Sequence, residues 1–185
     1  MNNINSLTRV ESNENRIIKL VKSLNQKKYR DREGLFYVEG VKFVMEAIAS
    51  SWEVRAILIS DSFAYSLGVK AYDSCDVRLG SYDGRLGEIT TQSSQNYILP
   101  DKLYAGISDT ESPQGIMAVV KQEHLSLDRT FGGANLFLIL DGIQDPGNMG
   151  TIIRTADSAA FNAIILSKGC VDIYNPKVVR STAGS

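Results

Sequence analysis

The chain has 185 residues, of which 43% are hydrophobic and 22% charged, so it can form one generous globular domain or two small ones. Its formal net charge of −1 excludes a protein that is basic over its whole surface, although a local basic patch could still bind RNA. No stretch approaches the roughly 18 apolar residues that cross a bilayer, and the polar N-terminus lacks a signal-peptide core. We therefore expect a soluble cytoplasmic protein.

The cysteines and the histidine do not favour disulfide, triad or metal chemistry. Cys75 and Cys170 lie far apart with no metal-like spacing, which is typical of reduced cytosolic thiols. His124 is the one histidine, and a lone histidine between two candidate domains is more typical of a surface residue than of a catalyst. We expect no metal site.

A basic cluster lies near the N-terminus. Its members are Arg16, Lys19, Lys22, Lys27, Lys28, Arg30 and Arg32, with Asp31 the only acid among them before Glu33. A charge run of this kind is usually a solvated helix face and loop. The alternative is a phosphate-binding surface for RNA, with Lys27, Lys28, Arg30 and Arg32 as the candidate contacts.

The first part of the chain alternates between helical and strand patterns. Apolar spacing predicts a helix over 16–24, capped by Ser12 or Asn13, and then a loop over 26–34. A strand over 35–38, a helix over 41–49, a strand over 54–60, a short helix over 61–67 and a strand over 115–121 follow. Val41, Val44, Met45 and Ile48 form the expected core stripe of the second helix. Residues 71–100 have no clean period and indicate a surface insertion or hairpin.

The second part begins after a linker that ends in a Gly-Gly turn. A continuous apolar run over 135–141 predicts a parallel strand covered on both faces. A helix over 151–160 and a strand over 163–167 complete a β-α-β unit with a right-handed crossover. A last helix is expected over 175–184, with Asn175 as its cap and Pro176 at its first position. We divide the chain into domains over 1–122 and 135–185, joined by the linker 123–134, and both domains are α/β.

The segment 140–161 carries the strongest chemical signal. It reads as a strand, a Gly/Pro-rich turn and a helix, with Asn148 in the turn and Arg154 one turn into the helix. Gly142, Gly147 and Gly150 allow backbone conformations or close approaches that other residues resist. Helix N-termini attract anions, and α/β sheets bind ligands at the carboxyl ends of their strands. Neither a Walker nor a G-x-G-x-x-G pattern is present, so an ordinary βα turn stays open on these grounds.

Two motifs resemble a known family. DPGNMGTIIRTAD (145–157) resembles the first signature motif of the SpoU/TrmH family of RNA 2′-O-ribose methyltransferases, and NPKVVRSTAGS (175–185) resembles the start of its second motif. EGVKFVMEA (39–47) and SDTESPQGIMAVV (108–120) resemble the substrate-binding domain that precedes the catalytic domain in many members. The resemblance is weakest across 71–100.

The resemblance implies a small ribosomal-protein-like α/β RNA-binding domain followed by a knotted, SPOUT-type methyltransferase domain. It implies S-adenosylmethionine as methyl donor, a ribose 2′-hydroxyl in ribosomal or transfer RNA as acceptor, and a homodimer. By position in the motifs, Asn148, Arg154 and Arg180 match the functional residues. Thr182, Ala183 and Gly184 match the loop that enters the donor site.

The family's third motif, a Gly-Asn-Glu-type segment, has no counterpart before Ser185. We therefore expect a truncated form with an incomplete donor site. Two alternatives remain: a non-catalytic RNA-binding module, and a plain nucleotide-binding α/β domain that uses the 141–150 turn.

Overall fold

The computed structural model describes residues 6–67, 76–78, 93, 95–123 and 136–185. The chain forms two compact units, Met1–Lys121 and Gln122–Ser185. Most of the predicted linker, including His124, and much of the predicted insertion lie outside the described residues, as does Cys75. The α/β class expected for the chain is confirmed in both units, because each pairs strands with helices.

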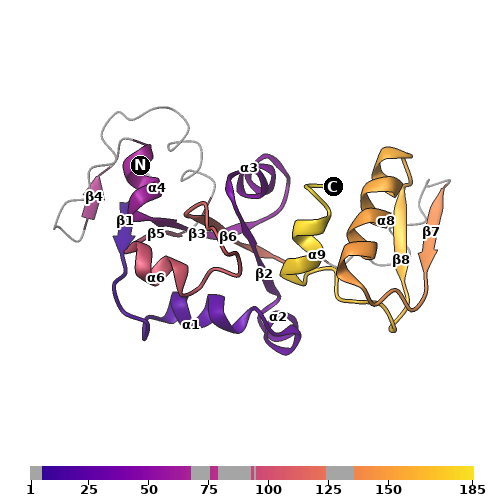
Figure 1. Cartoon of the computed structure of the whole chain (residues 1–185), viewed down its shortest axis with the longest axis horizontal. Helices are drawn as coiled ribbons and strands as arrows, with labels where there is room; N and C mark the ends of the chain where they lie inside the picture. Colours follow the sequence, from indigo (N-terminus) through magenta and orange to yellow (C-terminus); the bar gives the residue numbers. More distant parts are fainter. Residues whose placement is uncertain (1–5, 68–75, 79–92, 94, 124–135) are drawn as a thin grey trace. The chain divides into compact units, whose positions relative to one another are not determined.

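The N-terminal unit is built on a six-stranded sheet with the order β2-β6-β3-β5-β1-β4 (Figure 1). Strand β5 pairs in parallel with both β3 and β1. Strand β6 pairs antiparallel with β2 and with β3, and β4 pairs antiparallel with β1. The strands are β1 (Ser6–Arg9), β2 (Leu35–Glu39), β3 (Val54–Ser60), β4 (Asp76–Arg78), β5 (Gln95–Leu99) and β6 (Ile116–Lys121).

Helices cover this sheet because its central strands are apolar on both faces. Along β3, Ala56 and Leu58 join the core formed with the helices that precede β2 and follow β5, while Ile57 and Ile59 alternate to the opposite side. Figure 1 shows α1 and α6 on one side of the sheet and α3 on the other. The helices are α1 (Arg16–Ser23), α2 (Lys27–Glu33), α3 (Val41–Ala49), α4 (Asp61–Ser66) and α6 (Asp101–Ala105).

Several predicted elements are confirmed, and some are wrong. The strand over 54–60 and the helix over 41–49 have the predicted bounds. The predicted loop over 26–34 is instead mostly helix α2, which ends at Gly34 in a left-handed conformation with φ of 63°. Asn15, not Ser12 or Asn13, caps α1, because its side-chain oxygen accepts the Ile17 amide.

The interpretation of 71–100 as an insertion or hairpin is wrong for its last residues. Residues Gln95–Leu99 form β5, which lies between β3 and β1 inside the sheet. A second correction concerns Val41, which was expected in the core but is 40% exposed at the start of α3. Strand β1 and helix α6 had no clear sequence pattern and were not predicted.

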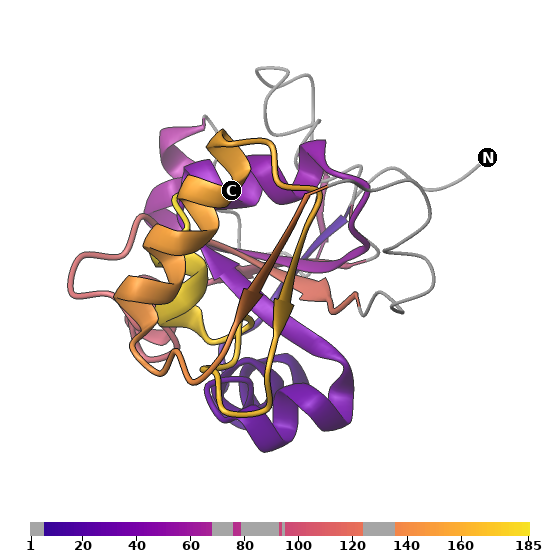
Figure 2. The same cartoon turned by 90° about the vertical axis from the view of Figure 1, so that its right-hand side faces the viewer.

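The C-terminal unit contains the expected β-α-β arrangement. Strand β7 (Phe137–Leu140) pairs in parallel with β8 (Ala163–Leu166), and the two lie side by side in Figure 2. Helix α8 (Pro146–Ser158) connects them, and α9 (Pro176–Ser181) follows β8. Leu140, Met149 and Val178 form the buried centre of this unit. Within the described residues β7 is not covered on both faces as predicted, because Ile139 is 71% exposed.

Both helices of this unit differ from prediction at their ends. Helix α8 begins at Pro146, five residues before the predicted start, because the Asp145 side chain caps it by accepting the Asn148 amide at 2.7 Å. The predicted turn residue Asn148 therefore lies in the first turn of the helix. Asn175 and Pro176 begin α9 as expected, but the helix ends at Ser181 and not at 184.

Candidate functional site

The loops that follow β7 and β8 are tied together at the carboxyl edge of the two strands. The Val171 amide donates to the Ile143 carbonyl oxygen at 2.7 Å, and the Gly142 amide lies 3.4 Å from the Ser167 hydroxyl. Gly142 has φ of 68°, and a side chain built there would meet nothing within 4 Å. This edge is where open α/β sheets bind ligands, and the main chain at Gly142 leaves it accessible.

Helices α8 and α9 meet at Gly150. A Cβ atom on Gly150 would lie 2.0 Å from the Ser181 Oγ and 2.5 Å from the Ser181 carbonyl carbon. The Ser181 hydroxyl also donates to the Pro146 carbonyl oxygen at 2.8 Å, which ties α9 to the first turn of α8. The predicted need for glycine is thus explained at Gly150 by close approach, and at Gly142 by its backbone conformation.

The two predicted arginines flank this helix contact. Arg180 directly precedes Ser181, and its Nη1 atom is buried. Arg154 is exposed and lies four residues after Gly150, so the helical repeat places both on the same side of α8. Asn148 is two residues before Gly150 and lies on another side, exposed in the first turn. Helical spacing therefore brings Arg154, and not Asn148, to the α9 side.

The segment after α9 forms a turn. Thr182 is buried, and its hydroxyl donates to the Val179 carbonyl oxygen at 2.8 Å. Ala183 and Gly184 follow with φ values of 54° and 101°. A non-glycine residue in the left-handed region is uncommon, so this turn is held in a specific conformation by its surroundings. It exposes Gly184 and leaves Ala183 half-buried.

In the basic cluster, the prediction for Arg30 is wrong. Its side chain is only 2% exposed, and its guanidinium donates to the Leu24 carbonyl oxygen at 2.7 Å. A buried guanidinium that binds the end of α1 cannot contact an RNA phosphate. Its role is to join α1 and α2.

The other members of the basic cluster are exposed, but acids within the cluster partly neutralise them. Lys27 pairs with Asp31 at 2.8 Å, and Arg32 pairs with Glu33 at 2.7 Å. Lys28 is exposed on α2 and belongs to neither of these two pairs. Exposed pairs of this kind are weak, so the surface keeps a positive surplus that a polyanion could use.

Among the described residues, no group of three or more histidine, cysteine or acidic side chains could hold a metal ion. No described helix is long and apolar enough to cross a membrane.

Comparison with known proteins gives one family match within each compact unit. Residues 15–118 match the MRM3-like substrate binding domain, and residues 135–185 match the SpoU rRNA methylase family. The 23S rRNA (guanosine(2553)-2′-O)-methyltransferase RlmP of Bacillus subtilis is 32% identical over 97% of this chain and 62% of its own length.

Solved structures show the same likeness. The AdoMet-bound rRNA methyltransferase from Sinorhizobium meliloti has a TM-score of 0.75 at 26% identity, covering 96% of this chain and 61% of that one. The SpoU methyltransferase AviRb from Streptomyces viridochromogenes, in complex with AdoMet, has a TM-score of 0.72 at 25% identity, covering 92% and 60%.

These matches define the class: an MRM3-like substrate binding domain followed by a segment of the SpoU rRNA methylase family. The chain belongs to the SpoU/TrmH family. It spans less than two thirds of the length of the curated relatives it matches: 62%, 37% and 58% of three of them.

Proposed function

We propose that this protein transfers a methyl group from S-adenosylmethionine to a ribose 2′-hydroxyl of ribosomal or transfer RNA. The observation that carries the proposal is the close contact of α8 and α9 at Gly150 and Ser181, which joins the helices that carry the two motif arginines, Arg154 and Arg180. The family membership supports the reaction class, and the names of the relatives support ribosomal RNA as the acceptor.

The described residues fit one wall of a donor site. Gly142 leaves open space at the carboxyl edge of β7, and the turn over Thr182, Ala183 and Gly184 presents main-chain groups after α9. The amides of Thr182, Ala183 and Gly184 already donate within this unit, so we assign the turn to shaping the edge of the donor site. When bound, S-adenosylmethionine supplies the methyl group on a sulfonium.

Positioning is the main task that the site residues perform. The 2′-oxygen must be in line with the methyl group, and it must lose its proton during the attack. An arginine is hard to deprotonate, which makes Arg154 a poor general base. We assign its planar fork to holding the target phosphate or the developing alkoxide, with proton loss to the phosphate or to water. Arg180 and Asn148 match functional positions of the two motifs, and we retain both as candidate catalytic residues.

Two measurements test this proposal. If the donor site forms without the third motif, calorimetric titration of the chain with S-adenosylmethionine should show binding, with ATP and NAD binding more weakly. Arg154→Lys should leave donor binding unchanged and lower methyl transfer to RNA about 100-fold, the usual loss when one donor to a developing oxyanion is removed. The exposed Lys177→Ala on α9 serves as the control and should retain full activity.

The two measurements can contradict different parts of the proposal. Full activity of Arg154→Lys would contradict both roles assigned to this residue, because the planar fork would then be unnecessary. Equal binding of ATP or NAD would instead favour a general nucleotide-binding domain.

A second function is favoured by the N-terminal unit alone. This unit has its own core, and residues 15–118 match a substrate-binding domain, so it could hold RNA without turnover. RNA binding without donor binding is the result expected of such a module.

The proposal includes the oligomeric state and the location of the protein. We expect a homodimer, as the family resemblance implies, and sedimentation equilibrium measures this. A cytoplasmic location is part of the same proposal, and the free thiol of Cys170 is compatible with a reducing compartment.

A further inference from the structure

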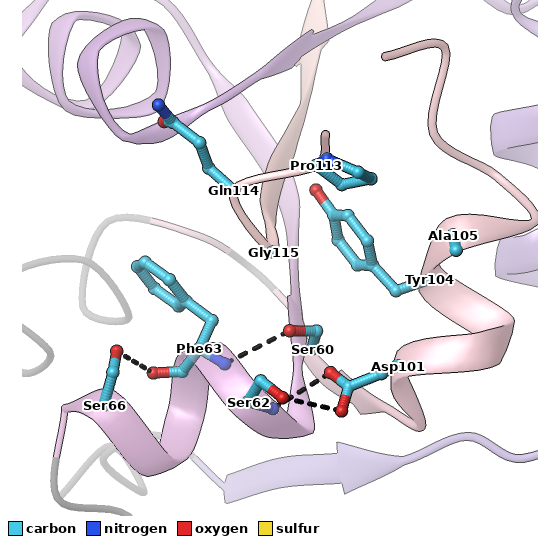
Figure 3. A pocket seen from close by; sticks show the side chains of 10 residues that line it. All are labelled: Ser60, Ser62, Phe63, Ser66, Asp101, Tyr104, Ala105, Pro113, Gln114 and Gly115. Carbon is cyan, nitrogen blue, oxygen red and sulfur yellow. Dashed lines mark hydrogen bonds between the residues drawn. The ribbon is translucent and has the colours of Figure 1, made fainter. Parts of the chain in front are cut away.

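A cavity of about 430 Å³ opens in the N-terminal unit at the carboxyl edge of β3 and β5 (Figure 3). Ser60 ends β3, and Asp101 begins the helix that follows β5. Gly115 lies at the same edge, because β6 runs antiparallel to β3 and starts there. The residues that line the cavity include Ser60, Ser62, Phe63, Asp101, Tyr104 and Gln114. The volume falls within the range of about 300–1,000 Å³ that is typical of small-ligand pockets.

The α4 wall of the cavity is fixed by hydrogen bonds. The Ser60 hydroxyl accepts the Phe63 amide at 3.2 Å and thereby caps α4. The Asp101 carboxylate accepts the Ser62 amide at 3.0 Å and the Ser62 hydroxyl at 2.7 Å, as Figure 3 shows. These bonds hold the pKa of Asp101 below its ordinary value, so the carboxylate stays ionised and acts only as an acceptor.

The loop above the cavity is equally constrained. Gly115 has φ of 81°, and a Cβ atom there would lie 2.5 Å from the Ser60 Oγ and 2.8 Å from the Phe63 Cβ. The side-chain oxygen of Gln114 accepts the Val41 amide at 2.8 Å, which joins this loop to the start of α3. The cavity is therefore shaped before any ligand arrives, which lowers the entropy cost of binding.

A buried carboxylate also holds the chain segment that leads to Gln114 and Gly115. Glu39 is 6% exposed and accepts the Ser108 hydroxyl at 2.5 Å and the Thr110 hydroxyl at 3.3 Å. Tyr104 lies on the cavity wall beside it, and burial together with the charge of Glu39 raises the pKa of the tyrosine. The Tyr104 hydroxyl consequently remains protonated at neutral pH.

The chemistry of the lining selects among ligands. No lysine or arginine is found among the described residues that line the cavity, so a phosphate would meet the Asp101 carboxylate without a compensating cation. Phe63 offers an aromatic ring, and each Asp101 carboxylate oxygen, although it already accepts a hydrogen bond from Ser62, has a further lone pair that can accept another. A flat, neutral group with hydrogen-bond donors on its edge suits this combination, and unpaired RNA bases are held by aromatic stacking and edge hydrogen bonds.

We propose that this cavity holds one unpaired nucleobase of the RNA substrate, stacked on Phe63 with its exocyclic amine on Asp101. The inference rests on the proposed RNA function and adds a base-reading site to it. Adenine, guanine and cytosine carry such an amine. The one edge donor of uracil, N3–H, lies between two carbonyl oxygens that the carboxylate repels, so the pocket discriminates against uridine.

Free nucleosides test the pocket without requiring the whole RNA. Adenosine, guanosine, cytidine and uridine are titrated separately into the isotope-labelled full chain, and the Ser62 and Gly115 amide signals are followed by NMR. The three nucleosides with an amine should shift both signals, and uridine should shift them least. Ribose 5-phosphate, which lacks a base, should leave them unchanged.

Two variants of helix α4 test whether nucleosides bind in the pocket or elsewhere on this helix. Phe63→Ala removes the stacking surface and should weaken nucleoside binding about tenfold, the effect expected for the loss of one stacked base. Tyr65→Ala is the matched control, because Tyr65 is also an aromatic residue of α4 but is 77% exposed and does not line the cavity. Its binding should equal that of the unmodified chain.

Three results would overturn the proposal. They are absence of any shift at Ser62 and Gly115 with all four nucleosides, equal shifts with ribose 5-phosphate, and equal loss in both variants. None of these depends on methyl transfer or on S-adenosylmethionine binding. The pocket can therefore fail while the methyltransferase function stands, and the reverse also holds.

Discussion

Gly150 is the residue on which the packing of α8 against α9 depends most. An alanine there would place its Cβ 2.5 Å from the Ser181 carbonyl carbon, which belongs to the main chain and cannot rotate away. Alanine favours a helix over glycine by about 0.5–1 kcal/mol, but overpacking costs about 1–3 kcal/mol. We expect Gly150→Ala to lower the stability of the C-terminal unit by about 1–2 kcal/mol, measured by amide hydrogen exchange in α8 and α9.

Gly147 provides the matched control for this substitution. It lies in the same helix, and the nearest atom to its added Cβ is the Asp145 side-chain Oδ1 at 3.2 Å. This contact needs a shift of only a few tenths of an ångström, which the Asp145 cap can accommodate while it still accepts the Asn148 amide, so Gly147→Ala should change the stability by less than about 1 kcal/mol. Equal protection in both variants and the unmodified chain would show that α9 can move away from Gly150 at little cost.

Single residues also show where sequence patterns are least informative. The charge run predicted Lys27, Lys28, Arg30 and Arg32 as one exposed surface, yet Arg30 is buried against the Leu24 carbonyl. Its apolar stem and its donors can satisfy a buried position when a carbonyl is available, and composition does not reveal that carbonyl. The motif residues were easier to place, because Pro176 and Asn175 have strong positional preferences at helix starts.

At the scale of elements, α1 offers a direct test of how its start is fixed. The Asn15 side chain accepts the Ile17 amide at 3.1 Å, so Asn15→Ala should reduce the free energy of unfolding by about 1 kcal/mol. Asn13→Ala is the control, since its side chain binds only the exposed Lys22 ammonium at 2.9 Å. Urea unfolding followed by Trp52 fluorescence measures both, and a larger loss for Asn13→Ala would contradict the observed cap.

Helices and strands with a clear hydrophobic period were predicted from the sequence. Elements that depend on pairing with other strands, or on a capping side chain, were not. Strand β3 and helix α3 were predicted with their observed bounds because each has an uninterrupted apolar pattern. Strand β5 carries polar Gln95 and Asn96 and was assigned to a surface insertion, although pairing with β1 and β3 places it inside the sheet. Similarly, the early start of α8 depends on the Asp145 cap, which is a local interaction rather than a period.

At the scale of the whole molecule, the candidate sites come from residues that are distant in sequence. The cavity in the N-terminal unit combines the ends of β3 and β5 with the start of β6, and only the fold brings these together. The motif residues of the C-terminal unit could be named from the sequence, since the family resemblance fixes their identity. Their arrangement around Gly150 could not, because it depends on how closely two helices approach.

If the basic cluster of α1 and α2 contacts RNA phosphates, its contribution to RNA binding is electrostatic and should depend on the salt concentration. Each phosphate contact that is lost should reduce the slope of log binding constant against log salt concentration by about 1. Lys28 is exposed and is not part of the pair that Lys27 forms with Asp31 at 2.8 Å. We therefore expect Lys28→Ala to reduce the slope more than Lys27→Ala. Lys102→Ala, an exposed residue of α6 outside the cluster, should leave it unchanged. If RNA binding is indifferent to salt in every variant, the cluster is only a solvated surface and the RNA must be held elsewhere.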